Sequence, residues 1–126
     1  MQQDYYEVFN IKLQEFLNDL RHSFPDITDI NLLSSSFMFL KNFHPKLPQQ
    51  IFHEHVAKQF AEQILENDES FFLNYDYQSI SNELNIDLDI VGRIKQIWTE
   101  LNEDNKDAIW KYMKILVLIN RKCMNE

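Results

Sequence analysis

Apolar residues recur at steps of three and four along most of the chain, which is the period of an amphipathic helix. The first stripe runs from Tyr6 to Phe24, and Pro25 should end it because the residue before a proline disfavours helical backbone angles. Asp26 or Thr28 then offers a cap for the next helix. The second stripe consists of Ile30, Leu33, Phe37 and Leu40, and Leu32 and Phe39 widen it.

Three consecutive serines, Ser34 to Ser36, interrupt this second stripe. Either a tight contact between helices or a frayed turn would account for them. A third helix is expected to begin at Leu47-Pro48, because proline is tolerated in a first helical turn. It should end near Asn67.

The segment from residue 67 to 77 has no clear period, although it holds four aromatic residues that need burial. Its Asn and Asp residues favour turns, so the pattern predicts a short helix or an ordered loop held by Phe71 and Phe72. Residues 79–84 could form another short helix.

Two further stripes complete the chain. Residues 88–101 are expected to form a helix capped by Asp87 or Asp89, and the last helix should start at Asp104 or Asn105. The apolar arc of the last helix is wide, which is typical of a central element packed on more than one side. The prediction is an all-α single domain over residues 1–126, a bundle of five or six helices joined by short loops.

Composition adds a surplus of aromatic residues to this picture. Phe, Tyr and Trp make up 13% of the chain, which contains one glycine and three prolines. Surface Tyr and Trp favour interfaces because they combine a large rigid contact area with a polar tip. Together with nearby acids they define the expected interaction surface, which comprises Tyr75, Tyr77, Asp87, Asp89, Trp98, Glu103, Asp104, Trp110 and Tyr112; Tyr5 is a further spare aromatic.

Charge is unevenly distributed along the chain, whose net charge is −8. Residues 62–107 contain twelve acids and three bases, whereas residues 108–126 carry four bases and one acid. The negative net charge argues against nucleic acid as a partner, because phosphate binding depends on Lys and Arg. The bases that could still contact a phosphate backbone form only a narrow face: Lys111, Lys114, Arg121 and Lys122.

No catalytic, cofactor-binding or metal-binding residues are predicted. His53 and His55 would point about 200° apart on a helix, whereas chelation favours a spacing of four residues, so we expect both histidines to face solvent or to cap a helix. Residues 87–92 resemble the start of a calcium loop, but Val91 replaces an oxygen ligand that such a loop needs. Cys123 is not near a base in any catalytic motif. We therefore expect a protein that is not an enzyme.

The single cysteine, Cys123, and the absence of a long apolar run bear on localisation. One cysteine cannot form an intramolecular disulfide, which favours a reducing compartment. The apolar run at residues 115–119 is far shorter than the ~20 residues that span a bilayer. The expected location is therefore the cytoplasm or nucleus, with no membrane partner.

Val91-Gly92-Arg93-Ile94, followed by Trp98, resembles the glycine–arginine step of Bcl-2-type apoptosis regulators. This resemblance implies that Gly92 admits a partner helix and that Arg93 pairs with an acid on it. The residues that follow depart from that family's buried central helix because they are polar: Lys95, Gln96 and Glu100.

Several segments together resemble small all-α proteins of nucleocytoplasmic large DNA viruses, the giant viruses. These segments are Phe16–Leu20 leading to Phe24-Pro25, Asp68–Phe72, Trp98–Leu101, and Asp104–Lys106 running into Ile109–Tyr112. The resemblance implies a viral protein of the host cytoplasm or nucleus, or one packaged in the virion. The expected function is non-enzymatic binding of a host or viral protein, or a structural role, and a homodimer is one form this could take. The alternative is an acidic decoy for basic proteins that associate with nucleic acids.

Overall fold

The computed structural model describes residues 3–85 and 87–125, and within these ranges every regular element is a helix. Because α3, η1 and α4 follow one another without a break, the described residues form seven helices, slightly more than the five or six predicted. The all-α prediction is confirmed. The elements are α1 (Tyr5–Ser23), α2 (Thr28–Phe43), α3 (Leu47–Phe52), the π-helical turn η1 (His53–Ala57), α4 (Lys58–Leu65), α5 (Glu69–Asn74), α6 (Gln78–Leu84), α7 (Leu88–Glu100) and α8 (Glu103–Cys123).

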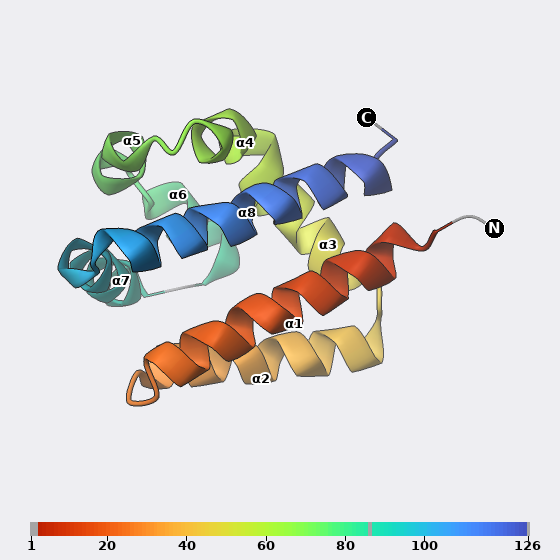
Figure 1. Cartoon of the computed structure of the whole chain (residues 1–126), viewed down its shortest axis with the longest axis horizontal. Helices are drawn as coiled ribbons and strands as arrows, with labels where there is room; N and C mark the ends of the chain where they lie inside the picture. The colour runs from red at the N-terminus through yellow and green to blue at the C-terminus, as the bar shows by residue number, and fades with distance from the viewer. Residues whose placement is uncertain (1–2, 86, 126) are drawn as a thin grey trace.

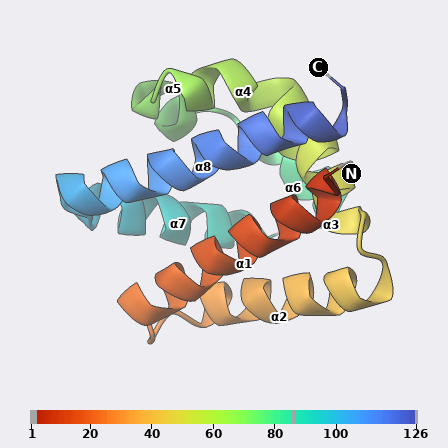
Figure 2. The ribbon, with the colours of Figure 1, turned by 45° about the vertical axis from the view of Figure 1, so that its right-hand side comes forward.

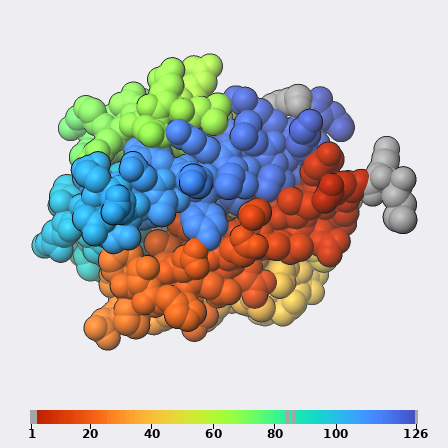
Figure 3. Space-filling view, viewed as in Figure 1, coloured from red at the N-terminus to blue at the C-terminus, as the bar shows by residue number. Residues whose placement is uncertain are grey.

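Three helices, α1, α2 and α8, give the fold its layered form. α1 packs against α2 on one side and against α8 on the other, and Figures 1 and 2 both show it between them. In the space-filling view α1 and α8 lie side by side and cover most of one face (Figure 3). The chain runs from α2 to α8 through the helices α3 to α7, and α4 packs against α8 as well.

The helix ends test the predicted boundaries. α1 ends at Ser23, as Pro25 predicts, and the predicted cap of α7 is found at Asp87, whose Oδ1 accepts the backbone N–H of Asp89 at 3.0 Å. The prediction of Asp26 or Thr28 as the cap of α2 is wrong. Ile27 holds that position, without a side-chain bond.

The predicted cap of α8 is wrong as well. Asn102 takes that position in place of Asp104 or Asn105, and its Oδ1 accepts the Asn105 backbone N–H at 2.8 Å. Sequence alone did not separate these choices because this turn contains four consecutive residues that cap or begin helices well.

Asparagines supply the left-handed backbone positions of the described chain. Asn67 follows α4 with φ 55°, and Asn85 caps the C-terminus of α6 with φ 54°. Asparagine tolerates this region better than other residues that carry a Cβ atom. The one glycine, Gly92, lies inside α7, so the chain ends these helices without glycine.

The core consists of two adjoining clusters, one where α8 meets α1 and one where α8 meets α4. Phe9, Phe16 and Leu116 form the first, between α1 and α8. The second lies between α4 and α8 and consists of Phe60, Ile64 and Val117, and Phe52 packs against both clusters. This arrangement explains the wide apolar arc of α8, which contacts α1, α4 and η1.

Two further predictions concern the serines of α2 and the segment after α4. α2 is continuous through Ser34–Ser36, and Ser34 is buried, so these residues do not form a frayed turn. Residues 69–74 form the short helix α5, and Phe71 and Phe72 pack against the second core cluster, as predicted.

Candidate protein-interaction surface

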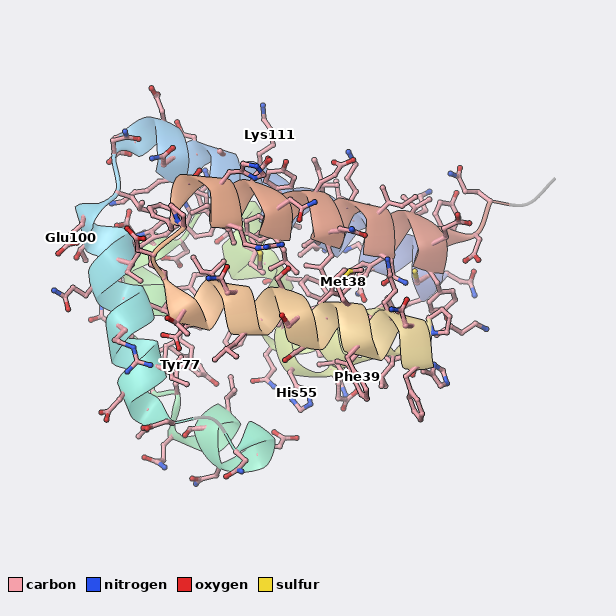
Figure 4. All side chains as sticks on the ribbon, turned by 90° about the horizontal axis from the view of Figure 1, so that it is seen from below. Met38, Phe39, His55, Tyr77, Glu100 and Lys111 are labelled. Carbon is pink, nitrogen blue, oxygen red and sulfur yellow. The ribbon has the colours of Figure 1, made fainter. Side chains whose placement is uncertain are left out.

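The outward side of α2 exposes several large apolar side chains. Leu32, Leu33, Phe39 and Phe43 expose 60%, 57%, 70% and 76% of their surface. We call these four residues the α2 face. The rings of Phe39 and Phe43 lie parallel, with centroids 6.2 Å apart, as expected for side chains one turn apart on a helix. Figure 4 shows Phe39 pointing away from α1, towards the side on which α6 and α7 lie.

The α2 face corrects the predicted orientation of this helix. Of the predicted inward stripe, Phe37 is buried and Ile30 and Leu40 are half-buried, but Leu33 is exposed. An apolar arc this wide cannot all face one neighbour. That width, visible in the sequence, is the signal that could have predicted the exposed face.

No charged residue lies between Ile30 and Leu40. Asp29 precedes this stretch and Lys41 follows it. The polar residues within it are uncharged: Asn31, Ser34, Ser35 and Ser36. In a chain in which 25% of residues are charged, this stretch could approach another apolar surface without burying an ion.

An ion pair joins α2 to α7. Arg93 Nε donates to Asp29 Oδ2 at 3.0 Å, and Arg93 Nη2 donates to Asp29 Oδ1 at 3.3 Å. The hydrogen bonds to Asp29 raise the pKa of Arg93. Beside this pair lies an open groove of about 550 Å³, lined on the α2 side by Asp26–Asp29 and on the α7 side by Arg93, Gln96, Ile97 and Glu100.

The four acids predicted at the interaction surface are exposed but do not form one cluster. Asp87 and Asp89 lie at the start of α7, whereas Glu103 and Asp104 lie at the start of α8. The whole of α7 separates the two pairs, a helix about 20 Å long. Glu103 and Asp104 also favour the positive end of the α8 dipole.

The aromatic residues Tyr75 and Tyr77 are half-buried beside α4 and α5. Tyr75 packs edge-on against Phe60, with centroids 4.9 Å apart. The Tyr77 hydroxyl donates to the carbonyl of Phe72 at 2.8 Å, and burial raises the pKa of Tyr77. Lys95 Nζ lies 5.1 Å from the centre of the Tyr77 ring, so this tyrosine also contacts α7.

The two tryptophans, Trp98 and Trp110, hold α5, α7 and α8 together. Their rings meet edge to face, with centroids 5.5 Å apart. Trp98 Nε1 donates to Glu69 Oε1 at 2.9 Å, and Lys106 Nζ reaches the same oxygen at 3.1 Å. These bonds from Trp98 and Lys106 lower the pKa of Glu69. Both tryptophans are half-buried in these contacts.

Tyr112 lies between α1 and α8. Its ring stacks on Phe16 at a centroid distance of 4.9 Å, and its hydroxyl donates to Asp19. The hydrogen bond to Asp19, together with burial, raises the pKa of Tyr112 to about 12. The five predicted aromatics are therefore all engaged between helices, and the two most exposed aromatics, Phe39 and Phe43, belong to α2.

Near Tyr112 a cavity of about 240 Å³ brings together Asp19, His22 and Ser23. These are the residue types of a nucleophilic triad. The Nδ1 atom of His22 lies 2.8 Å from the carbonyl oxygen of Asn18, and Asp19 accepts the hydroxyl of Tyr112. Because both side chains are oriented to other partners, these three residues do not form a Ser–His–Asp relay.

A buried polar cluster at η1 has no counterpart among the predicted sites. Gln49 Nε2 donates to Asn120 Oδ1 at 2.7 Å, and Asn120 Nδ2 lies 3.0 Å from His53 Nδ1. Gln49 and Asn120 are almost fully buried. The position of Asn120 on the apolar face of α8 was the signal in the sequence for a buried polar contact.

The histidines of η1 therefore differ from the expectation that they face solvent or cap a helix. His53 is bonded to Asn120, and His55 is half-buried, with Nδ1 3.8 Å from Glu83 Oε1 of α6. They do diverge, as their spacing predicts. Among residues 3–85 and 87–125, no group of three His, Cys, Asp or Glu side chains could hold a metal ion.

The thiol of Cys123 is half-buried near the end of α8. Burial, followed by the charge of Asp4, raises the pKa of Cys123. A raised pKa reduces the thiolate fraction and with it the nucleophilicity of the sulfur.

No family model matches this chain, and neither curated proteins nor solved structures yielded a similar protein. None of the helices in the described ranges is long and apolar enough to cross a membrane.

Proposed function

We propose that this protein is a non-enzymatic interaction protein that binds another protein chain through the α2 face. The observation that supports this proposal is the exposure of Phe39 and Phe43 on a stretch of helix that lacks charged residues. At about 200 Å² for each phenylalanine side chain, their exposed fractions of 70% and 76% amount to roughly 300 Å² of apolar surface.

This apolar area is large for a surface that contacts only solvent. Leu32 and Leu33 extend it, so the whole α2 face reaches the range of about 300–600 Å² that marks the largest patches of monomeric proteins, which are often functional. Phe39 and Phe43 present stacked rings, and aromatic residues of this kind act as anchors at interfaces.

The test is affinity capture from the cells that express the protein. The bait Phe39→Glu/Phe43→Glu should lose its captured proteins by at least about tenfold, because two carboxylates would oppose burial of the face. Leu118→Glu is the matched control, since Leu118 is an exposed apolar residue on α8. Equal capture by the wild-type protein, by Phe39→Glu/Phe43→Glu and by Leu118→Glu would contradict the proposal.

A second candidate function is binding of basic proteins through the acidic surface. The exposed pairs Asp87–Asp89 and Glu103–Asp104 favour this candidate, together with the net charge of −8. Such binding should weaken steeply as salt is added, because exposed charges are screened. Reversing the charge of these four residues should abolish capture of basic proteins, and unchanged capture would exclude the acidic decoy.

A viral origin and presence in the virion remain part of this proposal, supported by the resemblance of segments such as Trp98–Leu101 to giant-virus proteins. The Bcl-2-like alternative would require a partner acid to compete for Arg93, which pairs with Asp29 of the same chain. Mass spectrometry of purified virus particles tests whether the protein is present in the virion.

A further inference from the structure

We infer that η1 is an acid-responsive turn, in which a fall in pH exchanges an attachment to α8, made by His53, for an attachment to α6, made by His55. Neither histidine belongs to the α2 face, so this switch goes beyond the proposed function. Histidine suits such a role because it gains or loses its proton between about pH 5 and pH 8. The two rings have different partners, and each partner fits one protonation state.

The hydrogen bond of His53 requires a neutral ring. Gln49 Nε2 donates to Asn120 Oδ1 at 2.7 Å, so the other end of the Asn120 amide, Nδ2, is turned towards His53 Nδ1 at 3.0 Å. An amide nitrogen donates and does not accept, so the ring nitrogen is the acceptor. A protonated ring carries a hydrogen on both nitrogens, and it would set two donors against each other.

Turning both amides over would restore the two bonds only at a cost. Asn120 Oδ1 would then accept from protonated His53, and Asn120 Nδ2 would donate to Gln49 Oε1. The two N–H groups of Gln49 would come to lie at the buried position where Oε1 now has no partner among the described residues. Buried donors that lack acceptors are destabilising. Acid therefore weakens the link between α3, η1 and α8.

His55 has the opposite requirement. Its Nδ1 atom is buried without a hydrogen bond from the described residues, and Glu83 Oε1 of α6 lies 3.8 Å away. Figure 4 shows His55 on the side of the molecule where α6 lies. While Nδ1 carries no proton, two acceptors face each other. Protonation places a hydrogen on Nδ1, and a movement of about 1 Å then gives the distance of a charge-assisted hydrogen bond.

Other titratable groups around η1 come from the elements that pack against it, α3, α4 and α8. α3 contains none, and Lys58 of α4 is paired with Glu54 of η1 at 3.1 Å. Those at the end of α8 are two bases and a thiol: Arg121, Lys122 and Cys123. The bases disfavour a further positive charge nearby, and burial raises the pKa of Cys123. None of these groups offers protonated His53 a replacement for its lost bond.

The backbone of η1 couples the two histidines. The carbonyl of His53 accepts the backbone N–H of Lys58, five residues on, which is the bond of a π-helical turn. One residue separates His53 from His55, and the two rings meet partners on different helices. A movement of η1 towards α6 therefore draws His53 away from Asn120.

Hydrogen exchange of the full chain at about pH 7.5 and about pH 5.5 tests this switch, with each rate corrected for the intrinsic pH dependence of amide exchange. On acidification, amides of residues 47–52 and 116–123 should lose protection by about fivefold, the size expected for one hydrogen bond. Amides of residues 78–84 should gain protection by about twofold, as expected for an exposed ion pair. Changes of the same sign in both regions, or no change in either, overturn the inference.

Variants assign each response to its histidine. His53→Asn keeps an acceptor at the position of Nδ1 but takes up no proton, so it should abolish the acid response of residues 47–52 and 116–123 and leave that of residues 78–84. His53→Gln serves the same purpose if the first variant does not fold. Glu83→Gln should abolish the response of residues 78–84. His44→Asn, at an exposed histidine outside η1, is the matched control and should keep both responses. A response that persists in its own variant, or that disappears in the control, overturns the inference.

Discussion

Asn120 shows how one polar residue can specify the packing of a helix that is otherwise apolar. It connects α8 to Gln49 of α3 and to His53 of η1, and it lies on the same face as Leu116 and Val117. Buried amides stabilise a fold only when they are paired, because an unpaired group retains its desolvation cost. The pair therefore favours the one register of α8 in which the two amides are bonded to each other.

Replacing Asn120 with Leu should destabilise the protein, because it leaves the Gln49 amide buried without this partner. We expect a loss of about 1–3 kcal/mol in the free energy of unfolding, measured by urea denaturation. Gln49→Leu/Asn120→Leu should recover part of that loss, since neither amide then remains. Asn105→Ala, at an exposed position of α8, is the control; a loss no larger than that of the control would refute the role of the pair.

The Tyr112 hydroxyl should contribute to stability only while it is protonated. Its pKa is raised to about 12 in the folded protein, above the value of about 10 in an unfolded chain. The contribution is therefore fully present below pH about 10 and is lost as the pH rises through about 12. In a spectrophotometric titration, Tyr112→Phe should lack the phenolate step near pH 12, and a curve that retains this step would contradict the assignment.

At the scale of elements, α7 differs from α1 and α8 in how it is held. None of the residues of α7 is buried, whereas α1 contains buried residues of the first core cluster and α8 contains buried residues of both. Contacts at its ends and along one side attach α7, chiefly the Arg93–Asp29 pair and the Trp98–Trp110 contact. Its helical form depends strongly on local terms such as the Asp87 cap.

Gly92 is the residue of α7 with the lowest helix propensity. A Cβ atom at this position would meet no atom within 4 Å, and the backbone there is helical. Gly92→Ala should therefore raise the free energy of unfolding, by about 0.5–1 kcal/mol. Thermal unfolding followed by circular dichroism measures this effect. A decrease in stability would mean that the position tolerates no side chain; loss of partner capture without loss of stability would favour the Bcl-2-like alternative.

Across the described residues, the helices differ in how many buried apolar contacts hold them. α1, α4 and α8 contain the buried clusters, while α7 has no buried residue and is joined to the rest by the Arg93–Asp29 ion pair and by ring contacts. Exposed ion pairs contribute little to stability. Local opening should begin in the region that buries the fewest apolar contacts.

Hydrogen exchange should report this difference directly. Amides of α7 should exchange well before those in the middle of α1 and α8, because α7 can open without disrupting either core cluster. Asp29→Ala should speed exchange in α7 and leave α8 unchanged. Uniform protection across α1, α7 and α8 would contradict the lower local stability expected for α7.

The sequence by itself determined which segments are helical and several of their ends. The period of the apolar residues indicates α1, α2, α7 and α8, and Pro25 and Asp87 mark boundaries that the structure confirms. These are local effects, in which a residue acts on backbone a few positions away. The π-helical turn at η1 was not predicted, because it depends on the packing of His53–Ala57 against α8.

Only the tertiary structure decided which side of each wide apolar arc is free. Periodicity placed Leu33 inward and could not choose between the two edges of the α2 arc, because that choice depends on where α1 and α3 pack. In the same way, the predicted surface aromatics Tyr75, Trp98 and Trp110 are engaged between helices by partners distant in sequence. Long-range packing thus left Phe39 and Phe43 as the exposed aromatic pair and moved the candidate site to α2.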